Sequence, residues 1–221
     1  MASLRKPFSV LMATALAVLG LTGLAGAAPR TPDTGAEAHA GTELVQDTQS
    51  GPLDPGPFHR RLDPLVGEWK AVKYNWILGS ADKPVVSRDI TVRTRWITRT
   101  GGRFLEERTT GTLGGTAYFR EGILGFSNID RRYEWTTFDS VTPTAMTYRG
   151  PALTEGTSVI SIPGEFTDPG ILGPEYLGRT IPMRTVITIA PDDRHTFDLY
   201  FTPPGQAERL VDRVIYTKKL S

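Results

Sequence analysis

The sequence predicts an all-β protein, namely an up-and-down antiparallel β-barrel of about ten strands with a short N-terminal helix. The 23 Gly and 17 Pro among 221 residues divide the chain into short segments, which argues against long helices. Apolar and polar residues alternate with a period of two over most of the chain after Gly67. The connections are mostly short, and closing such a run of hairpins into a barrel hides its free edges. A two-layer sandwich is the alternative.

Residues 1–27 have the pattern of an export signal. A short basic start is followed by an apolar run over 11–24 and by the small residues Ala25, Gly26 and Ala27. We expect cleavage after Ala27. An uncleaved anchor is the alternative, but the apolar run is shorter than the ~20 residues that a bilayer span needs. The prediction is an exported protein, periplasmic or secreted, with no stable membrane anchor after cleavage.

Residues 28–57 are predicted to be a disordered spacer, because they are rich in Pro and Gly and hold no aromatic residue. The barrel domain is expected over 58–221. Once Arg5 and Lys6 leave with the leader, 23 basic residues face 24 acidic ones. The two signs alternate along the chain, so we expect no nucleic-acid partner. The chain has no Cys, which excludes disulfides and lipid attachment at a cysteine.

The expected elements follow in order from Phe58. Apolar residues at near-helical spacing over 58–66 predict one short helix, which ends at Gly67. Ten strands are then expected, over 71–78, 90–96, 103–112, 116–126, 132–140, 144–150, 157–163, 183–190, 195–202 and 208–218. The long connection over 164–182 is interpreted either as a lid over one end or as a simple crossing loop.

The common catalytic motifs are absent. There is no Gly-x-Ser-x-Gly, phosphate-binding loop or His-Glu-x-x-His sequence, and we expect no metal site. Glu106 and Glu107 are adjacent in a strand, so one of them must face inward. An inward carboxyl group in an apolar barrel has a raised pKa and can act as an acid. The alternative is a glutamate paired with Arg103 or Arg108.

Inward polar residues are the best candidates for a ligand site. Tyr118 and Arg120 share one face of their strand, and Trp135 and Asp139 share one face of the next. If these faces line the interior, Arg120 and Asp139 would orient an amphipathic ligand among aromatic rings. Alternatively, Arg120 and Asp139 form a buried pair that closes the barrel. The full set of candidate ligand-binding residues is Glu106, Tyr118, Arg120, Trp135, Asp139 and His195.

Histidine offers a minor variant of this site. His195 begins a strand with an apolar face and could be an axial haem ligand if it points into the cavity, as could His59. A solvated or capped strand end is the alternative for His195. No cofactor is expected otherwise.

Four motifs in order and spacing resemble the bacterial domain of unknown function 1579 family. They are His59-x-x-Leu62-x-x-Leu65-x-Gly67-x-Trp69, Gly101-Gly102-Arg103-Phe104-Leu105-Glu106-Glu107, Gly122-x-x-Gly125-Phe126-x-Asn128 and Ile215-Tyr216-Thr217-Lys218. The resemblance implies a calycin-like barrel similar to lipocalins, fatty-acid-binding proteins and nitrobindins. It also implies that Trp69 packs at the closed end of the barrel. The family has no assigned activity, so the resemblance bears on the fold more than on function.

Three functions follow as hypotheses. The leading one is an exported module that holds a small apolar or amphipathic molecule inside the barrel. The second is an enzyme, such as an isomerase, cyclase or hydrolase, that uses an inward carboxylate such as Glu106 or Asp139. The third is an envelope interaction protein with a filled barrel, which meets its partner through its surface or through the 28–57 spacer.

Overall fold

The computed structural model describes residues 51–150, 158–191 and 193–219, which belong to one compact unit, Asp47–Ser221. The predicted signal 1–27 and most of the predicted spacer lie outside the described residues. The elements are α1 (Pro57–Arg60), η1 (Asp63–Leu65), β1 (Gly67–Asn75), β2 (Val85–Trp96), η2 (Thr98–Thr100), β3 (Phe104–Leu113), β4 (Thr116–Ser127), β5 (Arg132–Asp139), β6 (Met146–Arg149), β7 (Val159–Thr167), η3 (Pro174–Tyr176), β8 (Thr180–Ala190), β9 (Arg194–Phe201) and β10 (Arg209–Lys218).

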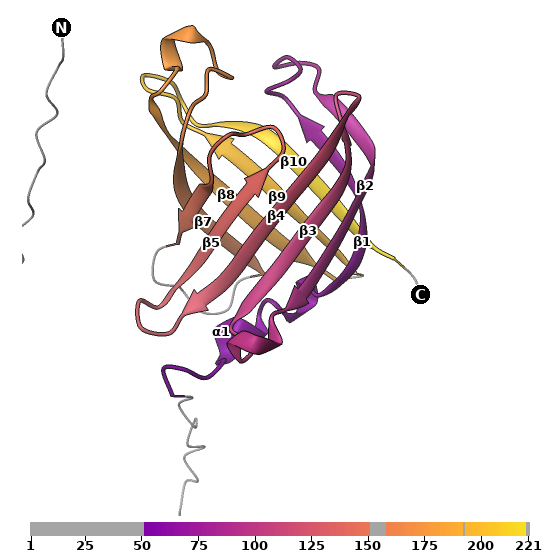
Figure 1. Cartoon of the computed structure of the whole chain (residues 1–221), viewed down its shortest axis with the longest axis vertical. Coiled ribbons are helices and arrows are strands. Elements are labelled where there is room, and N and C mark those ends of the chain that lie inside the picture. Colours follow the sequence, from indigo (N-terminus) through magenta and orange to yellow (C-terminus); the bar gives the residue numbers. More distant parts are fainter. Residues whose placement is uncertain (1–50, 151–157, 192, 220–221) are drawn as a thin grey trace, which may run out of the picture. The chain divides into compact units, whose positions relative to one another are not determined.

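The ten strands in the described part of the chain form one closed antiparallel barrel (Figure 1). Each strand pairs with the next along the chain, and β1 pairs with β10 from Trp69 opposite Lys218 to Asn75 opposite Asp212. Closure removes the free edges that an open sheet would present. The predicted all-β, up-and-down barrel is therefore confirmed, and the two-layer sandwich is wrong.

The connection expected over 164–182 is shorter than the sequence suggested. β7 and β8 extend into it, with Gly164 opposite Met183 and Glu165 opposite Pro182. Proline lacks the backbone N–H and glycine lacks a side chain, and a strand accepts either residue where that group is not needed for pairing or packing. The Gly and Pro residues in this stretch therefore made the predicted loop too long. The remaining connection, 168–179, lies at the end of the barrel opposite α1, where it is drawn in orange (Figure 1).

The predicted N-terminal helix is present, but it consists of two pieces. α1 ends at Arg60, and the chain continues into the 3₁₀ turn η1. Pro64 explains the break, because proline has no N–H to donate to the carbonyl four residues earlier, as a continuing α-helix requires.

α1 and η1 cover one end of the barrel, which we call the closed end. Leu62, Leu65 and Trp69 are all buried there, and the indole Nε1–H of Trp69 donates a hydrogen bond to the carbonyl oxygen of Leu65 over 3.0 Å. Gly67 has φ of 144°, a conformation that favours glycine. Trp69 thus lies where the family resemblance implied.

The last residues of the predicted spacer contact the barrel. The side-chain amide of Asn128 donates to the carbonyl oxygens of Pro52, over 3.4 Å, and Asp54, over 2.8 Å. Ordered packing therefore begins before Phe58.

Alternation along the strands decides which side chains enter the interior. On β4, Tyr118, Leu124 and Phe126 are buried, while Phe119 is 39% exposed. On β5, Trp135 is buried on the same inward face. The two residue sets that the sequence placed on common faces therefore line the interior.

Candidate functional site

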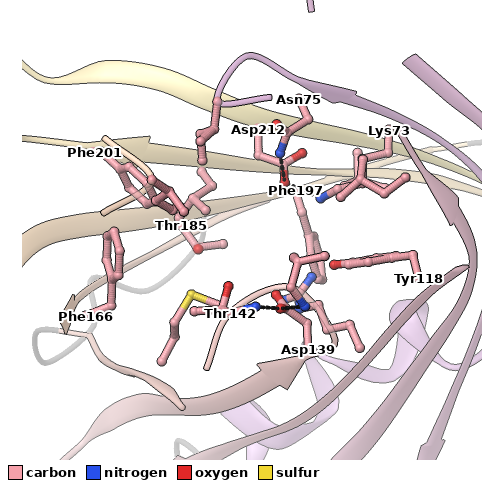
Figure 2. Close-up of a pocket in the computed structure, with 18 of the residues that line it drawn as sticks. Lys73, Asn75, Tyr118, Asp139, Thr142, Phe166, Thr185, Phe197, Phe201 and Asp212 are labelled. Carbon is pink, nitrogen blue, oxygen red and sulfur yellow. Dashed lines mark hydrogen bonds and ion pairs between the residues drawn. The ribbon is translucent and has the colours of Figure 1, made fainter. Parts of the chain in front are cut away.

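A cavity of about 110 Å³ occupies the barrel at the end opposite α1, which we call the open end. Its volume is several times what one water molecule requires. Figure 2 shows Phe166 and Phe201 on one side of the cavity, and Lys73 and Tyr118 on the other. The apolar and aromatic lining residues are Ile77, Leu78, Leu113, Trp135, Val141, Met146, Tyr148, Phe166, Ile171, Phe197, Leu199, Phe201 and Val214.

The first charged group in the cavity wall is an ion pair between β1 and β10. Lys73 Nζ donates a hydrogen bond to Asp212 Oδ2, and the amide of Asn75 contacts the same oxygen over 3.5 Å (Figure 2). Lys73 is 5% exposed and Asp212 is 9% exposed. Burial alone would lower the pKa of Lys73, but the nearby Asp212 carboxylate outweighs it, so the pKa lies above its ordinary value. Lys73 therefore stays charged and paired with Asp212.

The second charged group is Arg120 on β4. Its Nη1 lies 3.7 Å from Glu107 Oε1 on β3, and its guanidinium carbon lies 4.6 Å from the centre of the Trp135 ring. Burial lowers the pKa of Arg120, but Glu107 and the nearby tyrosines together raise it by more, so the net shift is upward. Burial also raises the pKa of Glu107, and the positive charges of Arg120 and Lys73 only partly offset this.

Tyr118 lies between these two charged groups. Its ring centre is 5.4 Å from Lys73 Nζ, an attractive cation–π geometry. Burial raises the pKa of its hydroxyl group, which therefore remains a neutral donor and acceptor near pH 7.

Four of the six residues predicted from the sequence line the cavity: Tyr118, Arg120, Trp135 and Asp139. Arg120 and Asp139 are opposite each other in the β4–β5 ladder, yet the buried pair that the sequence offered as the alternative does not form. Asp139 Oδ1 instead accepts the backbone N–H groups of Val141, over 2.9 Å, and Thr142, over 2.6 Å. The ion-pair partner of Arg120 among the described residues is Glu107.

Glu106 is on the outer surface of β3 and does not line the cavity. Its carboxylate accepts from Arg95 Nε over 2.6 Å and from Arg108 Nη2 over 3.0 Å. Because successive strand residues face opposite sides, Glu107 is the glutamate that enters the interior. The proposal of Glu106 as an inward acid is corrected accordingly, and its pairing with Arg108 agrees with the alternative.

His195 is buried at the closed end, away from the cavity lining. Its ring stacks on Tyr216 at 4.1 Å and meets the Trp69 ring edge-on at 4.4 Å. Burial lowers its pKa to about 3, so the ring is neutral near pH 7. His59 is also buried, and its Nδ1 accepts the backbone N–H of Gly56 over 3.1 Å. Neither histidine lines the cavity.

The candidate residues taken from the sequence omitted Lys73 and Asp212, which line the cavity, and included Glu106 in place of its inward neighbour Glu107. On β1 the more apolar set, with Val72 and Tyr74, faces outward, while Lys73 faces inward. The period of two was visible in the sequence, but the more apolar of the two faces of this strand is the outward one. Pairing the first strand with the last, as barrel closure requires, would have brought Lys73 close to Asp212.

A family model described as a protein of unknown function (DUF1579) matches residues 54–218. The chain belongs to this family. The match spans every strand of the DUF1579 barrel and begins close to the residues that Asn128 holds. A search of curated proteins finds no match.

Two other features of the DUF1579 barrel concern the described residues only. No group of three or more His, Cys, Asp or Glu side chains there is placed to hold a metal ion. No helix in that part of the chain has the length and apolar character of a membrane span.

Proposed function

We propose that this protein is exported and that its barrel binds a small amphipathic molecule in the open-end cavity. The observation that carries the proposal is the division of the cavity wall into two halves. Lys73, Tyr118 and Arg120 come from β1 and β4, whereas Phe166 and Phe201 come from β7 and β9. A molecule with a polar head and an apolar body matches both halves at once.

A ligand of one character would fit this wall poorly. A purely apolar molecule would take water from Arg120 and give it no acceptor, which is costly for a charged group. A purely polar molecule would leave the rings of Phe166 and Phe201, which pack at 4.7 Å, against water or polar atoms. The amphipathic class is therefore the one that the lining supports.

The rim of the cavity supports entry from the open end. Leu78, Val141 and Ile171 belong both to the cavity lining and to the exposed apolar residues, with 52%, 47% and 40% of their surface accessible. Each comes from a different connection between strands. An apolar rim of this kind suits the passage of an amphipathic molecule.

The binding proposal is tested by filling the cavity. Thr185 lies in the lining and is buried, whereas Thr188 is on the same strand and faces outward. We expect wild-type protein and Thr188→Phe to bind 1-octanol in a calorimetric titration, and Thr185→Phe to lose binding while retaining a cooperative thermal transition. Binding by Thr185→Phe equal to that of the wild type would place the ligand elsewhere and overturn the proposal.

Native mass spectrometry of protein purified gently from its host complements this test. A stoichiometric small molecule, released on denaturation, would identify the natural ligand directly. Sequencing the N-terminus of the same sample tests export, since the proposal predicts a mature chain that begins at Ala28. A chain that retains residues 1–27 would contradict cleavage after Ala27.

A further inference from the structure

Arg120 is a buried cation whose hydrogen-bonding capacity is largely unused. A guanidinium group carries five N–H donors. Among the described residues its one ion pair is with Glu107 at 3.7 Å, which is beyond hydrogen-bond distance, and its remaining polar contact is with the face of Trp135. The Arg120 side chain is only 12% exposed, so bulk water supplies few acceptors.

Lys73 provides a direct contrast within the same cavity. Its side chain is even less exposed than that of Arg120, but it is hydrogen-bonded to Asp212. Among the described residues, the fully enclosed polar side-chain atoms without a hydrogen bond include Glu107 Oε1 and Asp212 Oδ1 but no nitrogen of Arg120. Since Arg120 lines the cavity and Glu107 does not, the free donors of Arg120 open onto the cavity and Glu107 lies behind them.

We propose that the cavity selects an amphipathic acid, whose anionic head accepts hydrogen bonds from Arg120 while Glu107 takes up a proton from solvent. This inference rests on the proposed function and names the ligand class for that same site. Charge-assisted hydrogen bonds to a guanidinium are about twice as strong as neutral ones, so a carboxylate or similar anion is the head group best suited to Arg120.

Proton uptake follows from the arrangement of charges. With an acid bound, Arg120 would face two carboxylates in an interior of low dielectric, and one positive charge cannot balance both. Burial already raises the pKa of Glu107, so Glu107 is the group that becomes neutral. The ligand carboxylate keeps its charge and its hydrogen bonds.

The other ionisable groups around Glu107 and Arg120 do not change this balance. Lys73 on β1 and Asp212 on β10 neutralise each other. Asp139 on β5 is occupied by two backbone N–H groups at the rim. Burial raises the pKa of every tyrosine near the pair, so all are neutral at pH 7; they are Tyr118, Tyr148 and Tyr216.

The test compares three probes with the same eight-carbon chain: octanoate, 1-octanol and octylamine. Calorimetric titration of the mature protein should show octanoate binding about tenfold tighter than 1-octanol, with protonated octylamine weakest. Arg120→Leu should remove the preference for octanoate over 1-octanol. Equal affinity for all three probes, or a preference for the amine, would overturn the inference while leaving the proposed function in place.

Proton uptake is measured by repeating the octanoate titration in buffers of different ionisation enthalpy. We expect wild-type protein to take up as much as about one proton per octanoate, and its affinity to fall as the pH rises past the pKa of Glu107. Glu107→Gln keeps the shape of the side chain, so it should bind octanoate more tightly and without proton uptake. Glu106→Gln, on the outer surface, should behave as the wild type.

Two results would contradict the role of Glu107. One is proton uptake that persists in Glu107→Gln, and the other is weaker octanoate binding by that variant. A purely structural glutamate would give the second result. If 1-octanol and octanoate both fail to bind the wild type, the proposed function itself fails.

Discussion

The two ends of the barrel interior use the same strands in opposite ways. At the closed end, Trp69 on β1 packs against His195 on β9, and burial keeps that histidine uncharged near pH 7. At the open end, Lys73 on β1 faces the cavity and pairs with Asp212. Along β1, the interior thus changes from an aromatic core at Trp69 to a charged wall at Lys73 within two steps of the inward alternation.

The closed end therefore serves mainly the stability of the fold, whereas the open end holds the groups proposed to bind a ligand. The closed end is filled by large buried side chains, among them Trp69, Tyr133 and Leu62, and its helix segments cover it. The open end keeps a cavity, two cations and enclosed carboxylate oxygens without hydrogen bonds. Buried charges and carboxylate oxygens without hydrogen bonds reduce the free energy of unfolding, and a fold accommodates them where the rest of the core is well packed.

The largest expected effect tests the charged wall. Lys73→Met leaves the Asp212 carboxylate buried without a counterion, and we expect a loss of about 3 to 5 kcal/mol in the free energy of unfolding. The double variant Lys73→Met, Asp212→Leu removes both charges and should come within about 1 kcal/mol of the wild type, or exceed it. Urea denaturation of the single and double variants measures both values.

The comparison between single and double variants carries its own control. Asp212→Leu alone should also be strongly destabilising, because Lys73 then loses its partner. If the losses of the two single variants simply add in the double variant, the two side chains are not coupled and the ion pair does not account for the cost.

The next effect tests the closed end. Burial holds the pKa of His195 at about 3 in the folded protein, against about 6.5 in the unfolded chain. The unfolded state therefore binds more protons between these values, and the stability that depends on a neutral His195 is lost as the pH falls through this window. From pH 7 to pH 4 we expect this residue to account for a loss of about 3 kcal/mol.

His195→Leu isolates that contribution. The variant loses some packing at every pH, but its free energy of unfolding should fall less steeply than that of the wild type as the pH drops from about 7 to about 4. Identical slopes in the two proteins would mean that His195 is not the group whose protonation destabilises the closed end.

The fold was largely predictable, because it depends on features that a sequence displays directly. The period of two, the turn residues between strands and the motif ending in Trp69 all indicated a closed barrel with a helix-covered end, as the structure confirms. The sets on β4 and β5 that contain Arg120 and Trp135 were also correctly grouped.

The site was less predictable, because its partners come from strands far apart in the sequence. A pair between Arg120 and Asp139, its neighbour in the ladder, was one of two alternatives, but the Arg120 side chain reaches toward Glu107 on the other adjacent strand. Glu106 and Glu107 differ by one step of alternation, and the sequence held no marker for which one is inward. The direction in which a long side chain extends, and the face of a polar strand that turns inward, can both be determined only from the assembled barrel.

The smallest expected effect concerns how firmly the open end is held. Asp168 is buried at the start of the 168–179 connection, and its carboxylate accepts the backbone N–H groups of Gly170, Ile171 and Leu172. Asp168→Ala removes these acceptors and should cost about 1 to 2 kcal/mol, with the largest increase in amide hydrogen exchange at those three residues. Asp168→Asn retains an acceptor at Oδ1, so it should lose less. Because Ile171 also lines the cavity, release of this connection should speed ligand dissociation without affecting exchange around Trp69. An increase in exchange that spreads equally to the closed end would show that the two ends unfold together and do not differ in local stability.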